Sequence, residues 1–314
     1  MTKARENSDY TGLAADIVAG DTAARAGRKN LIINGGFDVW QRGDYTSATN
    51  SVSDAYLADR WKTWLGNVTA TTQNTSVTIN GKTKSAFKIE ATNSATGYMG
   101  LLQVIEDKNF PKNEDVIASA WVRTNNINTR FRETGFSGSG SNGPTFNSDG
   151  GWHKVTWNIG TKTTPSTGHM VIGIIIFGSS SVSISSGDYI EIADFQLELG
   201  SVATDFEHRS YGEELALCQR YYQVDDNAYG NSGKSYSMAS LDMPVTITRT
   251  HSVTMRASPT VVFTSNNRDS SNNVITANIN ASVADSWWYG YRKGGGSSLE
   301  VAVQVSNLSF DAEL

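Results

Sequence analysis

Carboxylates are the first residue type to test for chemistry, because hydrolysis of a glycosidic bond needs two of them about 5–10 Å apart across a cleft. Residues 188–200 read DYIEIADFQLELG and carry Glu191, Asp194 and Glu198. On an extended strand only Asp194 and Glu198 share a parity, and the strand rise separates them by roughly 13–14 Å. That spacing is too large for such a pair, whereas a pair contributed by two different strands stays open.

Sharper catalytic and metal-binding signatures are absent. The sequence contains no P-loop, no dinucleotide fingerprint, no His-Glu-x-x-His helix and no Gly-x-Ser-x-Gly elbow. The single cysteine, Cys218, allows neither an internal disulfide nor a cysteine zinc site. The four histidines are isolated from one another in sequence: His153, His169, His208 and His251. We therefore expect no enzyme, no catalytic residue, no metal site and no cofactor.

Aromatic clusters are better candidates for function. Two of them, DRWKTW and WHKVTW, contribute tryptophan pairs, and a third, SWWYGYRK, combines four aromatic rings with basic side chains. On a strand, the rings of SWWYGY alternate between two faces, which predicts that at least one is exposed. Exposed rings stack on sugars, and neighbouring basic groups suit acidic glycans. The alternative is that one face is buried in the core and the other in a subunit interface. The predicted glycan-binding residues are Trp287, Trp288, Tyr289, Tyr291 and Arg292.

Charge and hydropathy restrict the partners. The 314-residue chain has a net charge of −5 and a pI near 5.4, and it lacks a basic cluster, so we expect no nucleic acid partner. The longest apolar run, at residues 171–178, is too short to span a bilayer. The N-terminal residues lack the apolar segment of a secretory signal. These features predict a protein made in a cytoplasm, with no membrane insertion.

Period-two hydropathy dominates residues 30–210. In SAFKIEA, Phe87 and Ile89 share one face and Lys88 and Glu90 the other, as expected of a half-buried antiparallel strand. About ten such strands predict an all-β antiparallel sandwich. In residues 188–200 the apolar parity changes, which predicts either burial on both faces near the start or a bulge. The glycine- and serine-rich residues 135–151 are predicted to be a loop with no role in the core.

The stretch NLIINGGFDVWQRG at residues 30–43 is predicted to be the opening strand of this sandwich. Leu31, Ile33 and Phe37 would be buried, and the paired glycines allow a turn or a bulge. Arg42 is expected to pair with a carboxylate such as Asp59.

Three further regions complete the organisation. Residues 1–29 lack an apolar face and are predicted to be an attachment arm that orders on a partner. A capping-box spacing from Ser210 to Glu213 predicts a connector helix over 211–222. Six more strand patterns predict a second, smaller β domain over 223–314.

Four motifs in this order resemble a module of tail fibres and related receptor-binding proteins of tailed bacteriophages. They are NLIINGGFDVWQRG at 30–43, LADRW at 57–61, IADFQLELGSVATDFEHRSYGEELALCQRYYQ at 192–223 and MRASPTVVF at 255–263. The resemblance covers roughly residues 28–314. It implies a jelly-roll sandwich similar to carbohydrate-binding modules, carried on a virion as a homotrimeric tail fibre and used to recognise a host-cell glycan.

The resemblance also sets expectations for partners and metal. Residues 1–29 would attach to a phage tail or adaptor protein. In a trimer, the apolar stretches at 100–106 and 171–178 would cover their outer faces only on association. Related modules often hold a structural calcium with an opening acid and a later acid pair; here Asp38 fits, but the pair reads Ala193-Asp194. Calcium is therefore not predicted. The alternatives are an accessory carbohydrate-binding module of a glycan-active enzyme and a polysaccharide depolymerase.

Overall fold

The computed structural model divides the chain between Ser210 and Tyr211 into two units, which are described separately. In the second unit, side chains are described at 211–224, 251–261 and 309–313, and elsewhere only the backbone. The described residues are 29–106, 113–134, 140–162, 169–177, 183–225, 235–237, 245–265, 268–269, 276–280, 286–292, 300–302 and 305–313.

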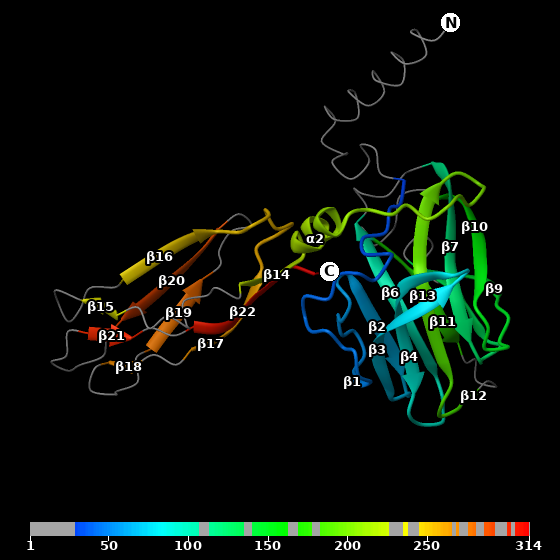
Figure 1. Ribbon diagram of the computed structural model, residues 1–314, viewed down its shortest axis with the longest axis horizontal. Coiled ribbons are helices and arrows are strands. Elements are labelled where there is room, and N and C mark those ends of the chain that lie inside the picture. Colours follow the sequence, from blue (N-terminus) through cyan, green and yellow to red (C-terminus); the bar gives the residue numbers. More distant parts are fainter. Residues whose placement is uncertain are drawn as a thin grey trace, which may run out of the picture. The chain divides into compact units, whose positions relative to one another are not determined.

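The first unit is a sandwich of two antiparallel sheets (Figure 1). The six-stranded sheet has the order β1-β3-β4-β13-β7-β10. Its strands are β1 (Thr49–Ser51), β3 (Ala70–Ile79), β4 (Lys82–Ala91), β7 (Glu114–Thr124), β10 (His153–Lys162) and β13 (Tyr189–Leu199). The five-stranded sheet has the order β2-β6-β11-β8-β9. Its strands are β2 (Trp61–Gly66), β6 (Tyr98–Glu106), β8 (Thr129–Thr134), β9 (Ser141–Thr145) and β11 (His169–Phe177). A small ladder joins β5 (Ala95–Thr96) to β12 (Ser183–Ile184).

The connectivity is that of a jelly roll. Among eight successive large strands, the first pairs with the last and the remaining six pair in the same nested way, as β4·β13, β6·β11, β7·β10 and β8·β9. The chain therefore crosses between the two sheets at almost every step. The predicted all-β jelly-roll sandwich is confirmed.

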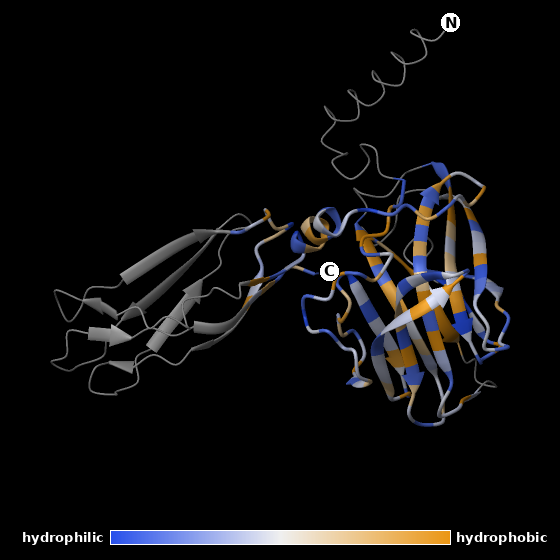
Figure 2. Cartoon of the chain, in the orientation of Figure 1, coloured by the Kyte–Doolittle hydropathy of each residue, from blue (hydrophilic) through white to orange (hydrophobic). Residues whose placement is uncertain are grey.

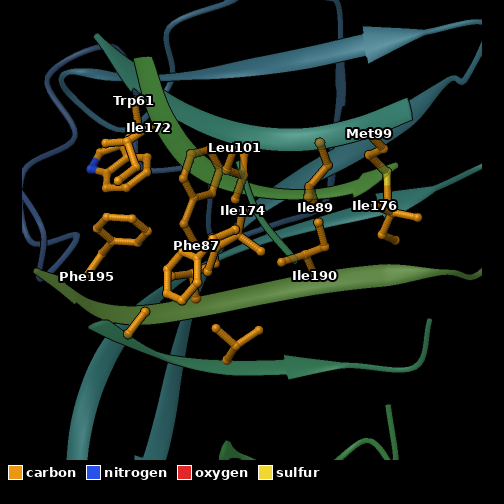
Figure 3. Close-up of a cluster of buried hydrophobic side chains, with 14 of the residues drawn as sticks. Trp61, Phe87, Ile89, Met99, Leu101, Ile172, Ile174, Ile176, Ile190 and Phe195 are labelled. Atoms are coloured by element: carbon orange, nitrogen blue, oxygen red, sulfur yellow. The ribbon is translucent and has the colours of Figure 1, made fainter. Parts of the chain in front are cut away.

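The core lies between the sheets and follows the predicted alternation (Figures 2 and 3). Phe87 and Ile89 on β4 are fully buried, whereas Lys88 and Glu90 are half-buried and form an ion pair at 2.5 Å. Trp61 packs edge-on against Phe195, with ring centroids 5.1 Å apart. Burial of such rings supplies roughly 25 cal/mol for each Å² of apolar surface removed from water, which stabilises the sandwich.

β13 shows both of the features predicted from its mixed hydropathy, burial on both faces and a bulge. Its residues from Ile190 to Glu198 are buried, and the register shifts between Ala193 and Gln196. Asp194 sits in this bulge with φ 50°. As a result Ile190 faces the core before the bulge and Phe195 faces it afterwards.

The prediction of an opening strand at residues 30–43 is wrong. They form no strand; two turn-forming residues, Asn34 and Phe37, have positive φ. Ile32 is fully buried, whereas the predicted Leu31 and Ile33 are half-buried. The reason is that the segment runs irregularly along β13 instead of alternating on a sheet, with its amide at Leu31 bonded to the carbonyl of Leu197 at 2.8 Å.

Other features of this stretch follow the prediction. Phe37 is fully buried, and Arg42 pairs with Asp59 at 3.4 Å. Gly35 allows the close approach to β13, because a Cβ there would lie 2.1 Å from the carbonyl oxygen of Phe195.

The chain enters and leaves the sandwich at one corner. Glu207 accepts hydrogen bonds from the backbone amides of Lys29 and Asn30 at 3.1 and 2.8 Å. Arg209 donates to the carbonyl of Ile32 at 3.0 Å. The last residues of the first unit therefore hold its first described residues in place.

The five-stranded sheet corrects two predictions. Leu102, Val104 and Ile175, which alternate with core residues on β6 and β11, are buried within the single chain. Association is therefore not needed to cover these strands. Residues 135–151 were predicted to stay out of the core, but β9 lies within them and Phe146 packs in the core against Phe131 at 5.1 Å. Residues 135–139 lie outside the described residues.

The second unit contains one helix among its described residues, α2 (Tyr211–Gln219), followed by short antiparallel sheets. The helix begins directly after Ser210, as the capping box predicts, but it ends three residues before the predicted Tyr222, which instead opens β14. No helix in the described part of the chain is long and apolar enough to cross a membrane. The strands are β14 (Tyr222–Asp225), β15 (Ser235–Ser237), β16 (Val245–Thr250), β17 (Thr260–Ser265), β18 (Arg268–Asp269), β19 (Thr276–Asn280), β20 (Ser286–Arg292), β21 (Glu300–Ala302) and β22 (Val305–Asp311).

Candidate functional site

The predicted aromatic and basic run lies on β20, the central strand of the β16-β20-β19 sheet. The backbone of Trp288 pairs with Thr248 on one side and with Asn280 on the other. The side chains of Trp287, Trp288, Tyr289, Tyr291 and Arg292 are outside the described side chains, as is the adjoining loop at 293–298. Their role in glycan binding stays a prediction.

A different set of aromatic residues gathers on the outer face of the six-stranded sheet. Trp121 on β7 alternates with core residues and packs with Trp152 on an outer apolar cluster that contains Ala86 and Ala193. Tyr189 begins β13 two residues from Glu191, which pairs in register with Arg123. We call this surface the aromatic face and define it by Trp121, Arg123, Trp152, Tyr189 and Lys88.

Cations bridge the rings of the aromatic face. The Arg123 guanidinium lies 5.4 Å from the centre of the Trp152 ring and 6.0 Å from that of Tyr189. The Lys88 ammonium lies 5.2 Å from the Tyr189 ring centre. These contacts hold half-buried rings in a fixed orientation. A ligand that stacked on them would therefore lose less free energy to the ordering of side chains.

Glu191 fixes Arg123 from below. Its side chain is 1 % exposed and accepts a hydrogen bond from Arg123 Nε at 2.8 Å, with a second from Arg123 Nη2. The hydroxyl of Thr75 donates to the other carboxylate oxygen at 2.6 Å. Three strands thus supply one polar network beneath the rings.

A groove borders the aromatic face at Trp121. It consists of two adjoining cavities of about 290 and 340 Å³, which share five lining residues. The shared residues are Lys82, Lys84, Asp194, Phe206 and His208. Trp121 and Lys154 line the second cavity, and Asp38 lines the first. The volume of each cavity is at the lower end of the range of ligand-binding pockets.

Ion pairs in the groove leave both donors and acceptors at its wall. The ammonium of Lys84 on β4 pairs with the Asp194 carboxylate in the bulge of β13, and both side chains are mostly buried. Lys154 lies 4.0 Å from Asp205 in an exposed pair. The rings of Phe206 and His208 meet edge-on at 5.0 Å.

Each carboxylate of β13 has a structural partner. Glu191 binds Arg123 and Asp194 binds Lys84. Glu198 accepts hydrogen bonds from the amide and hydroxyl of Thr204 at 2.7 and 2.6 Å. These interactions account for three buried acids without assigning them to catalysis.

The residues considered for calcium lie beside the same groove. Asp38 accepts a hydrogen bond from the Ser85 hydroxyl at 2.8 Å, and the Lys84 ammonium contacts Asp194. No cluster of three or more His, Cys, Asp or Glu with the geometry of a metal site occurs among the described residues.

The other tryptophans named in the sequence patterns differ in how deeply they are buried. Trp61 is fully buried in the core, and Trp157 is partly buried against it. The ring of Trp64 contacts that of Tyr98 on the five-stranded sheet in a tilted arrangement, with centroids 4.4 Å apart. His153 bonds to Asp149 at 2.8 Å, and His251 packs edge-on against Phe310 at 4.7 Å.

Sequence reasoning missed Trp121 and the groove. The groove residues come from the segment at 36–38, β3 and β4 with the turn between them, β7, β10, β13 and the segment after β13, so no short motif joins them. The available signal was the alternation in VIASAWVRT, which already placed Trp121 opposite the core-facing Ala120 and Val122.

Comparisons with known proteins find only distant similarity. No protein-family model matches the chain, and no curated protein matches its sequence. Among solved structures, TmCBM61 in complex with beta-1,4-galactotriose is 16 % identical, with a TM-score of 0.31, over 55 % of this chain and 100 % of that one.

Two further structures show how varied the matches are. The enzymatically active domain of bacteriophage CBA120 tailspike protein 4 is 15 % identical, with a TM-score of 0.34, over 55 % of this chain and 21 % of that one. A Stig cyclase from Fischerella sp. TAU is 12 % identical, with a TM-score of 0.38, over 56 % and 98 %. Similarity at this level carries no conclusion about ligand or activity.

Proposed function

We propose that this protein binds a glycan through the aromatic face and the adjoining groove. The observation that carries the proposal is the position of Trp121, a half-buried ring that packs, like Trp152, against the outer apolar cluster and also lines the groove. An indole ring offers a flat apolar surface to the C–H face of a sugar. The Lys84–Asp194 pair beside it offers a donor and an acceptor to the hydroxyl groups.

We further propose that binding occurs without catalysis. Supporting this, the buried carboxylates of β13 are bonded to Arg123, Lys84 and Thr204. The depolymerase alternative predicts new reducing ends or unsaturated products when the protein is incubated with a bound polysaccharide. Detection of such products would replace the non-catalytic proposal.

A glycan array tests the proposed site. The wild type is compared with Trp121→Ala and Trp152→Ala, and Trp64→Ala serves as the matched control because it is a half-buried tryptophan on the other sheet, in contact with Tyr98. Loss of one stacking ring is worth about 1–3 kcal/mol, which corresponds to about 5- to 150-fold in affinity. Binding that survives both face substitutions would overturn the proposal.

A second candidate function, a structural role in a phage tail fibre, rests on the four sequence motifs and their order. In this setting residues 1–29 attach the protein to a tail or adaptor, the virion is its location, and the fibre is a homotrimer. Deleting residues 1–29 is then expected to leave the melting temperature nearly unchanged and to abolish incorporation into particles. A stable monomer of about 34 kDa in sedimentation would count against the trimer.

Host contact through β20 remains part of this second candidate. Trp287→Ala and Trp288→Ala are expected to have different effects. Substitution of the core-facing tryptophan should lower stability, and substitution of the exposed one should weaken adsorption to host cells. If neither changes adsorption, recognition belongs to the first unit.

A further inference from the structure

The cations around the aromatic face and groove are matched in number by carboxylates. The surface contains five cations, Lys82, Lys84, Lys88, Arg123 and Lys154, and five carboxylates, Asp38, Glu90, Glu191, Asp194 and Asp205. Aromatic rings beside basic side chains would suit an acidic glycan only if those cations were free to bind a second carboxylate.

Most of these cations are already paired. Arg123 is bonded to Glu191, Lys84 to Asp194 and Lys88 to Glu90. The side chains of Glu191 and Asp194 are mostly buried, at 1 % and 8 % exposed. Separating either carboxylate from its cation would leave a buried charge without a partner, which is strongly unfavourable.

We infer that Glu191, Asp194 and Asp205 are specificity-determining residues that neutralise the cations of this surface and restrict it to uncharged glycans. The inference rests on the proposed glycan-binding function and adds the charge class of the ligand. An acidic polymer gains little attraction from a surface of balanced charge, and the net charge of −5 adds a weak long-range repulsion.

The balance can be broken without knowledge of the natural ligand. In the double variant Asp194→Asn/Asp205→Asn, Lys84 and Lys154 lose their carboxylate partners. The matched control is Asp44→Asn/Asp54→Asn, which changes the net charge equally at two exposed aspartates that do not line the groove. The probes are polygalacturonate and its carboxyl-reduced form, at about 20 mM ionic strength, where screening is weak.

Affinity electrophoresis of the wild type is expected to show weaker binding to polygalacturonate than to the reduced polymer. The double variant is expected to bind polygalacturonate on the order of tenfold more tightly than the control does. Asp205→Asn alone, which alters an exposed side chain and leaves the buried pair intact, is expected to give a smaller gain in the same direction.

Two results would overturn the inference. One is a wild type that binds polygalacturonate at least as tightly as its reduced form; the other is a gain in the double variant no larger than in the control. The proposed function fails separately, through glycan binding that is indifferent to Trp121→Ala and Trp152→Ala. Acidic-glycan binding abolished by Trp121→Ala would retain the proposed site and reject only the charge rule.

Discussion

The outer faces of the two sheets are filled differently. On the five-stranded sheet, Leu102, Val104 and Ile175 are buried aliphatic residues, and Ile175 lies over Gly100, where an added Cβ would approach within 2.3 Å. On the six-stranded sheet, half-buried rings alternate with ion pairs, as at Trp152 and Arg123. The five-stranded sheet also carries rings, such as Trp64 against Tyr98, but ion pairs beneath fixed rings and an adjoining groove occur on the six-stranded sheet, where we propose that a glycan binds.

The largest expected effect breaks the packed face. Ile175→Ala removes a fully buried side chain and should lower the free energy of unfolding by about 2–5 kcal/mol. Urea denaturation measures this directly. Trp152→Ala, on the aromatic face, should cost less because its ring is only half-buried. Equal losses would remove the distinction between the two faces.

An intermediate effect is expected beneath the aromatic face. Arg123→Met leaves the buried Glu191 carboxylate without its guanidinium and should destabilise the fold by about 1–3 kcal/mol. The double variant Arg123→Met/Glu191→Met removes both charges and should recover part of that loss. A loss of unfolding free energy in the double variant that exceeds the summed losses of the two single variants would contradict this account of the network.

The smallest stability effect concerns the corner where the chain enters and leaves the sandwich. Burial alone would raise the pKa of Glu207, but hydrogen bonds from the Asn30 and Lys29 amides, together with Arg209, hold its pKa below the ordinary value. The pKa of a glutamate in the unfolded chain is about 4.3. Because the folded pKa is lower, this stabilisation is fully present above that value and is lost as the pH falls through the folded pKa.

Acid titration of stability tests this interaction. The wild type should lose stability as the pH falls below about 4.3, and Glu207→Gln should lose less over the same range. Identical slopes for the two proteins would show that Glu207 contributes nothing to the pH dependence.

The sequence predicted features that depend on local periodicity. Phe87 and Ile89 alternate with Lys88 as expected, and the parity change in β13 correctly indicated a bulge. The pairing of Arg42 with Asp59 was also predicted.

The features that were missed depend on segments distant in sequence. Leu31 and Ile33 look like one face of a strand, but β13 supports this segment as an irregular chain that buries Ile32 instead. Phe146 reaches the core from a glycine-rich stretch because β9 extends the sheet there. The groove joins Lys84 to Asp194, 110 positions apart, which only the register of β4 and β13 determines.

The most direct test of the central claim is a two-dimensional NMR titration of the assigned tryptophan indole N–H resonances with an array-identified glycan. The sequence contains eight tryptophans, which report on the core, both outer faces and β20 in a single spectrum. Saturable shifts at Trp121 and Trp152, with Trp61 and Trp64 unchanged, are the predicted result. Shifts confined to Trp64, or to Trp287 and Trp288, would place the glycan elsewhere and contradict the account.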